Sequence, residues 1–260
     1  MGAGRSPASR AGGGGRSAAI PPQQVTPPTP QQVAQGNVLP NGGVAYDEFL
    51  KMSDDDKADV VADALQVGLP LFLDDSPLQR LAYFTGMSDK PTMVDDSALD
   101  SMRGQDIFRT VHDTYNSSLD IGYSATEIYK QIAYGDFTMY SDSGGSAYGR
   151  GIYFADSFRE SSLYQQGAQN KNWTMRAKIT SGKTISTGQL TRDFSRALNA
   201  GDKLANACDR FSTRDSLNLY ALAKGYSAVI DGSSGYHMIL NRGCLTMSKT
   251  TKRPNSGGSW

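Results

Sequence analysis

Residues 149–164 read GRGIYFADSFRESSLY, and this stretch decides how the rest of the chain is interpreted. Gly149 and Gly151 belong to a loop in which the backbone can approach a neighbouring molecule, because no Cβ stands in the way. The apolar residues 152–155 after them predict a short strand, and a helix is expected from about 157 to 166. The stretch therefore predicts a glycine loop, a strand and a helix in direct succession.

Short strands and helices alternate on both sides of this stretch. The sequence Ser-Ala-Thr-Glu at 124–127 is a capping box, which opens a helix. Other runs predict strands at 106–112, 173–179, 184–186, 226–230 and 236–241, and helices at 191–198 and 216–224. Many short strands with interspersed helices predict an α+β domain over residues 104–250.

The segments outside this domain differ from it in composition. Residues 1–45 hold 9 of the 28 glycines and 7 of the 11 prolines, and we predict a disordered tail because such a segment buries little apolar surface. Residues 46–103 carry 13 acidic and 5 basic residues, and Ser53–Asp56 is a typical helix start. We therefore predict a small acidic helical subdomain there. Residues 251–260 are predicted to be a disordered C-terminus.

Charge and cysteine content exclude several classes of protein. The 26 basic and 26 acidic residues cancel, so the chain has no overall positive charge to attract nucleic acid, and a nucleic-acid partner is not expected. No apolar run has the length of a membrane-spanning helix. Cys208 and Cys244 are the only cysteines, and His112 and His237 the only histidines, so neither a disulfide scaffold nor a metal centre is expected. A reducing compartment follows, the cytoplasm of a bacterium or host cell.

The glycine loop and its flanking residues resemble the NAD-binding signature of the ADP-ribosyltransferases, in the branch shared by diphtheria-type toxins and poly-ADP-ribose polymerases. The matching residues include Gly151, Tyr153, Ser161 and Tyr164. The resemblance implies that the two tyrosines stack the nicotinamide ring of NAD⁺ and that Ser161 orients its carboxamide. It covers about residues 105–248 and implies an ADP-ribosyltransferase-like split β-sandwich with flanking helices, two small packed sheets with an NAD⁺ cleft between them.

A second element of the family lies on the first strand of its fold. Arg109 aligns with the arginine of one branch, and Thr110 stands where the histidine branch has glycine. The resemblance implies that Arg109 anchors the ribose or phosphates of NAD⁺, which a guanidinium can bind through two parallel hydrogen bonds. His112 is expected on the opposite strand face from Arg109.

The third element departs from the family pattern. Active members carry a glutamate at the start of a late strand, where it stabilises the transition state electrostatically. Tyr236 takes this position here, and the chain has no glutamate after Glu160. Asp231 is the nearest acid and the candidate to substitute for it, although an aspartate before glycine is typical of a turn. His237 is expected on the face opposite Tyr236.

Two functions agree with these residues. The first is a mono-ADP-ribosyltransferase, a glycosyltransferase that cleaves the nicotinamide glycosidic bond of NAD⁺ and transfers ADP-ribose to a macromolecular acceptor, a protein rather than nucleic acid. Arg109, Tyr236 and Asp231 are its candidate catalytic residues, and no metal is expected. The alternative is a catalytically weak or inactive module of the same fold with a binding or structural role, for example in a phage particle.

Overall fold

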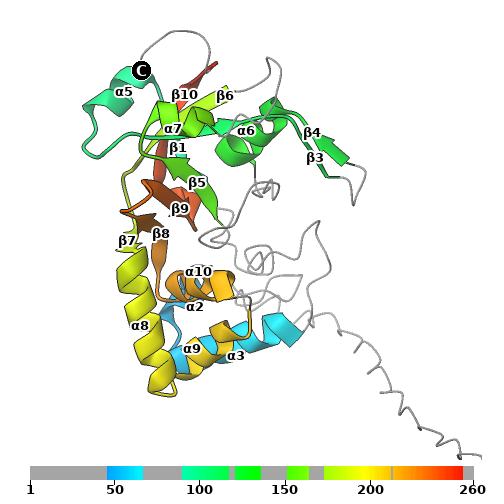
Figure 1. Cartoon of the computed structure of the whole chain (residues 1–260), viewed down its shortest axis with the longest axis vertical. Helices are drawn as coiled ribbons and strands as arrows, with labels where there is room; N and C mark the ends of the chain where they lie inside the picture. The colour runs from blue at the N-terminus through cyan, green and yellow to red at the C-terminus, as the bar shows by residue number, and fades with distance from the viewer. Residues whose placement is uncertain are drawn as a thin grey trace, which may run out of the picture.

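The computed structural model describes residues 46–66, 90–116, 121–135, 151–163, 173–211 and 213–253. These residues form an eight-stranded mixed sheet, a separate two-stranded hairpin and a set of helices (Figure 1). The prediction of an α+β chain is confirmed. The expected tail at 1–45 and most of the expected disordered C-terminus lie outside the described residues.

The large sheet has the strand order β1-β10-β6-β2-β5-β9-β8-β7. Its strands are β1 (Thr92–Val94), β2 (Ile107–Val111), β5 (Ile152–Ala155), β6 (Trp173–Ile179), β7 (Lys183–Ser186), β8 (Tyr226–Asp231), β9 (Tyr236–Ile239) and β10 (Leu245–Lys252). The strands β1 and β7 at the two edges run parallel to their neighbours, and the inner pairs are antiparallel. The hairpin consists of β3 (Thr114–Asn116) and β4 (Ile121–Tyr123).

The middle of this sheet is weakly joined. Strand β2 pairs with β6 over its full length, Ile107 to Val111, and β5 pairs with β9 over Ile152 to Ala155. Between β2 and β5 the register holds a single pair, Phe108 with Ala155. The described strands therefore form one continuous sheet with two halves, which differs from the expected two separate sheets.

Helices cover both faces. They are α2 (Tyr46–Lys51), α3 (Asp54–Gln66), α5 (Asp96–Ser101), α6 (Ala125–Tyr134), α7 (Phe158–Leu163), α8 (Thr187–Asn199), α9 (Lys203–Asp209) and α10 (Thr213–Ala223). The predicted capping box of α6 is confirmed: the Glu127 N–H donates to Ser124 Oγ, and the Ser124 N–H donates to Glu127 Oε2 at 2.7 Å. Ser186 and Asp202 cap α8 and α9 in a similar way, which satisfies backbone N–H groups of the first turns.

Two hydrophobic clusters lie on opposite faces of the sheet, and alternation along the strands assigns residues to them. Val229 and Met238 belong to the first cluster, which α2, α3, α8, α9 and α10 cover. Ala228 and Ile239 belong to the second, which α6 covers. Figure 1 shows the five helices of the first cluster gathered at the end of the sheet formed by β7 and β8.

Helices α2 and α3 of the segment 46–103, predicted to be an acidic helical subdomain, pack into the first cluster. Phe49 and Val61 are each 1% exposed and lie in the first cluster together with residues of α8, α9 and α10. Asp55 accepts a hydrogen bond from Lys203 Nζ at 2.7 Å, and β1 pairs with β10. The acidic residues mark a solvated helix face, whereas the apolar face of the same helices completes the core.

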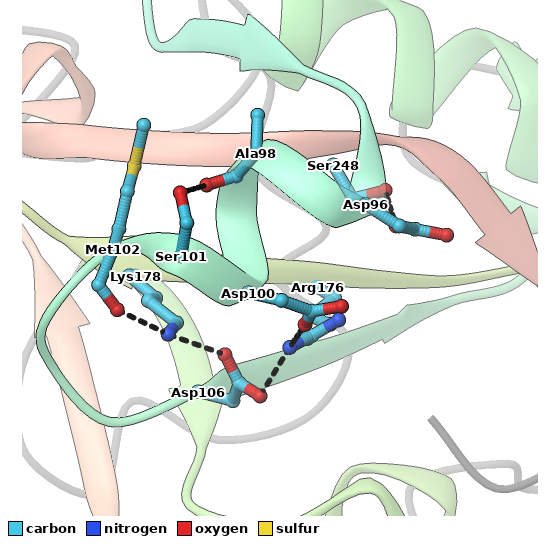
Figure 2. A network of polar contacts seen from close by, with 9 residues as sticks. All are labelled: Asp96, Ala98, Asp100, Ser101, Met102, Asp106, Arg176, Lys178 and Ser248. Carbon is cyan, nitrogen blue, oxygen red and sulfur yellow. Dashed lines mark hydrogen bonds and ion pairs between the residues drawn. The ribbon is translucent and has the colours of Figure 1, made fainter.

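A buried ionic network anchors the chain that leads into β2 (Figure 2). Arg176 on β6 donates from Nη2 to Asp106 Oδ2 at 2.6 Å and to Asp100. Lys178, two residues along the same strand, donates to the Met102 carbonyl at 2.8 Å. Both cations are almost fully buried, so the two aspartates and the carbonyl supply the partners that buried charge requires. The network fixes the end of α5 and the start of β2 against the sheet.

Arg242 organises the other side of the sheet. It lies in the 3-10 turn η3 (Arg242–Cys244) and is 1% exposed. Its Nη1 donates to the carbonyls of Gln131 at 2.6 Å and Ile132 at 2.9 Å, and its Nη2 donates to the Gly135 carbonyl. The guanidinium thus satisfies carbonyls at the C-terminal end of α6, where helical donors run out. Among the helices in the described ranges, none combines the length and the apolar character needed to cross a bilayer.

Candidate functional site

The three sequence elements predicted to form one site lie on neighbouring strands. Arg109 is on β2, Tyr153 on β5 and Tyr236 on β9, and these strands are consecutive in the sheet. Tyr236 pairs with Ala155, so its side chain shares a face with Tyr153. The two rings meet edge to face with centroids 6.4 Å apart. The structure therefore brings the two tyrosines together, although more than eighty positions separate them. Strand alternation puts the Arg109 side chain on the opposite face of the sheet, the face of Ile107 and Val111.

Arg109 lies at the joint between the two halves of the sheet. Its Nη1 donates to the Tyr153 carbonyl at 2.8 Å. This contact adds a side-chain link where the ladder between β2 and β5 holds only one residue pair. It also places a positive charge beside His112, and burial together with this charge lowers the pKa of His112.

Ser161 does not stand alone on α7. Its Oγ lies 2.9 Å from Thr110 Oγ1 on β2, which in turn lies 2.8 Å from Thr174 Oγ1 on β6. All three residues are buried, with exposed fractions of 3%, 9% and 0% respectively. We call these three residues the hydroxyl cluster. Its middle member is Thr110, at the position where the resemblance gives glycine in one branch.

Gly151 has a packing role in this structure. A Cβ at this position would lie 3.3 Å from the Ile239 carbonyl oxygen and 3.4 Å from Met238 Cβ. The missing side chain therefore lets β5 approach β9 closely. Gly149 and Tyr164 lie outside the described residues.

Asp231 pairs with Tyr236 across β8 and β9, and its carboxylate bonds the turn between these strands. Its Oδ2 accepts hydrogen bonds from the Ser234 N–H at 3.0 Å, from Ser233 Oγ at 2.9 Å and from Ser234 Oγ. These bonds hold the connection between β8 and β9 and keep the carboxylate within the turn. Asp231 thus lies next to Tyr236 with its carboxylate bonded within the turn, and its replacement of the family glutamate stays a prediction.

Two carboxylates that the sequence analysis does not predict, those of Asp156 and Glu160, lie near the start of β9. His237 is buried and pairs with Phe154, on the face opposite Tyr236 as its position predicts, and its Nε2 lies 2.5 Å from Asp156 Oδ1. Gly235 precedes Tyr236 with φ +70°, and a Cβ there would lie 2.8 Å from Asp156 Oδ2 and 3.4 Å from Glu160 Oε2. Asp156 and Glu160 are neighbours in the chain, but only the pairing of β5 with β9 brings them to His237 and Gly235, so no local sequence signal marks the contact.

A hollow of about 490 Å³ lies elsewhere, in the helical layer. Its lining combines rings and charges of both signs and includes Asp193, Arg196, Asp202, Tyr220, Lys224 and Tyr226. None of the predicted site residues lines it, so it does not belong to the candidate site. Within the described parts of the chain, no group of three or more His, Cys, Asp or Glu side chains is arranged to hold a metal ion.

No protein-family model, curated protein or solved structure matches this chain significantly. The functional proposal therefore depends on the residues of the 149–164 stretch and on their neighbours in β2, β6 and β9.

Proposed function

We propose that this protein binds NAD⁺ and acts as a mono-ADP-ribosyltransferase. The observation that carries the proposal is that Tyr153 on β5 and Tyr236 on β9 meet on one face of the sheet, beside β2, whose Arg109 bonds the Tyr153 carbonyl. The proposal includes an ADP-ribosyltransferase-like split β-sandwich. The single residue pair between β2 and β5 supports it, because the continuous sheet is most weakly joined where the cleft would lie.

The proposed roles follow from the chemistry of each group. Nicotinamide in NAD⁺ is a flat cationic ring, and the Tyr153 ring offers stacking and cation–π attraction. Arg109, whose Nη1 bonds the Tyr153 carbonyl, is the proposed donor for ribose or phosphate oxygens. Ser161 would orient the carboxamide.

The reaction breaks the bond between C1′ of the ribose and the ring nitrogen. The bonding electron pair leaves with nicotinamide, which departs neutral, and C1′ becomes an oxocarbenium-like centre. A nucleophile of the acceptor protein then bonds to C1′ and loses its proton to solvent. Tyr236, at the family's glutamate position, offers a phenol oxygen to the ribose hydroxyls in place of a carboxylate.

A specific observation favours the second function, a binding module with weak or no catalysis. Asp231 is held in its turn, and Asp156 lies against His237 on the face opposite Tyr236. The nearest carboxylates thus have structural partners or lie outside the corner next to Tyr236. Slow transfer, or binding without transfer, is the expected consequence.

Calorimetric titration of the full chain with NAD⁺, combined with a nicotinamide-release assay, separates the two functions. Binding with release supports the transferase, binding without release supports the module, and no binding overturns both. Arg109→Ala should weaken NAD⁺ binding by about 1.5–3 kcal/mol, the range for hydrogen bonds to a charged group. Arg192→Ala is the control, because Arg192 bonds only Gln189 on the exposed side of α8 among the described contacts.

Tyr236→Glu tests the corner directly. A carboxylate at this position should increase nicotinamide release, since negative charge stabilises the oxocarbenium-like centre. Tyr236→Gln is the matched control: it removes the same ring contact with Tyr153 and adds no charge. Equal release by the two variants would show that Tyr236 does not lie at the reacting centre.

A further inference from the structure

We propose that Thr110 and Thr174 are positioning residues of the NAD⁺ site, which fix the Ser161 hydroxyl as a hydrogen-bond donor toward the carboxamide oxygen of nicotinamide. The inference rests on the proposed function. It adds a reason why the site would prefer a ring that carries a carbonyl group, such as the carboxamide of nicotinamide. Its basis is the hydroxyl cluster, which links α7, β2 and β6.

The geometry of the cluster is a short chain of oxygens. Thr174 Oγ1 and Thr110 Oγ1 are 2.8 Å apart across the register pair that joins β6 and β2. Thr110 Oγ1 and Ser161 Oγ are 2.9 Å apart. Both distances are those of ordinary hydroxyl hydrogen bonds. Thr110 is therefore the middle of the chain, and Thr174 and Ser161 are its ends.

Counting protons shows that the chain lacks one acceptor. Three hydroxyls carry three protons, but the two contacts use only two of them. In the part of the chain that the structure describes, none of the three side chains has another hydrogen-bond partner. Among the described residues, one buried O–H therefore has no acceptor, which costs free energy until something supplies one.

The position of the unmatched proton depends on the direction of the chain. If Thr174 and Ser161 both donate to Thr110, the Thr110 proton is left in the middle of the cluster. If Ser161 donates to Thr110 and Thr110 to Thr174, the proton is left on Thr174, which is 0% exposed between two strands. Only the direction Thr174 to Thr110 to Ser161 leaves it on α7, the element that carries the predicted ligand contact. A ligand oxygen at Ser161 therefore selects this direction, and each bond polarises the next.

This arrangement explains why a threonine at position 110 suits this chain. A glycine there would leave Ser161 without its neighbour on β2. With Thr110 and Thr174 supplying the upstream donors, Ser161 is pre-organised as a donor, and it discriminates in favour of a strong acceptor such as a carboxamide oxygen.

The test compares NAD⁺ with its thionicotinamide analogue, whose sulfur is a weak acceptor, by calorimetric titration of the full chain. Thr174→Val keeps the shape of the side chain and removes the terminal hydroxyl. We expect it to weaken NAD⁺ binding about three- to tenfold, the effect of one net hydrogen bond, and to change the binding of the analogue less than about twofold. Thr174→Ser should restore the wild-type ratio of the two affinities.

Thr246→Val is the matched control. Thr246 is also buried, and its Oγ1 lies 2.8 Å from the hydroxyl of another threonine, Thr180. Thr246 lies on β10 and has no contact with the hydroxyl cluster among the described hydrogen bonds. It should leave both affinities unchanged. If Thr174→Val does not fold, Thr110→Val removes the middle hydroxyl and should lower the same ratio.

Thr174→Val could instead weaken the binding of NAD⁺ and of its analogue equally, or Thr174→Ser could fail to restore the ratio of the two affinities. Either result would show that the hydroxyls only stabilise the fold. It would overturn the inference, provided that the wild type binds NAD⁺. Absence of NAD⁺ binding by the wild type would instead overturn the proposed function, and this inference with it.

Discussion

Replacing Arg242 with methionine tests how much stability depends on one buried guanidinium. The side chain is 1% exposed and donates to the carbonyls of Gln131, Ile132 and Gly135 at the end of α6. A hydrogen bond to a charged group contributes about 1.5–3 kcal/mol, and such contributions from one group are not additive. Methionine fills much of the same volume but leaves the three carbonyls without this donor. We therefore expect the free energy of unfolding to fall by about 3–5 kcal/mol, similar to the loss of one partner of a buried ion pair.

Urea denaturation followed by circular dichroism measures this loss. Arg242→Lys keeps the charge but not the fork of donors, so it should lose an intermediate amount, about 1–3 kcal/mol. Arg196→Met is the control on the exposed side of α8, where the guanidinium lies 3.4 Å from Asp193 and 77% of its side chain is exposed, and it should change stability by less than about 0.5 kcal/mol. A loss below about 1 kcal/mol for Arg242→Met would refute the assigned role of this residue at the end of α6.

Three further predictions concern backbone conformation, pH and thiol reactivity. Gly235→Ala should destabilise the protein more than Gly201→Ala in thermal denaturation. Both glycines have positive φ, at +70° and +73°, but only at Gly235 would the new Cβ meet a carboxylate oxygen. Equal losses of stability would contradict the steric argument. Burial and a neighbouring guanidinium lower the pKa of His112, so the unfolded chain binds more protons than the folded protein just below about pH 6.5. The free energy of unfolding should therefore fall as the pH drops through this range. His112→Gln should flatten this dependence on pH, and an unchanged slope would exclude His112 as its cause. Burial raises the pKa of Cys208 and raises that of Cys244 to about 12. Neither thiol should therefore react with Ellman's reagent in the native protein, and both should react in guanidinium chloride. Fast labelling of either thiol in the native protein would contradict this.

The elements that local signals specify could be predicted from the sequence. The capping box at Ser124 and Glu127 fixes the start of α6, and the strands β2, β6 and β8 lie within a residue of the predicted ranges. Strand β10 was not predicted, because its sequence LTMSKTTK carries polar residues on a buried face, as at Thr246 and Ser248. Those residues are buried only because Thr180 and Asp96, from distant segments, supply their hydrogen-bond partners.

In the candidate site, too, local contacts could be predicted from the sequence and long-range contacts could not. The spacing of the 149–164 stretch correctly relates a strand to the helix that carries Ser161, because the two are consecutive in the chain. The contacts of Thr110 could not be predicted, since it lies 51 positions from Ser161 and 64 positions from Thr174. Sheet register brings it to Thr174, and the packing of α7 on β2 brings it to Ser161. The proximity of Asp156 to His237 depends equally on how β5 pairs with β9.

The packing of α2 and α3 against α9 and α10 has a consequence for anyone dividing this chain into fragments. A piece that begins at residue 104 would keep the whole glycine stretch yet uncover the apolar surface on which Phe49 and Val61 now lie. It would also strip β1 from β10 and leave a long edge strand open to pairing with other molecules. Such a fragment should aggregate, so the shortest useful recombinant protein starts at or before residue 46.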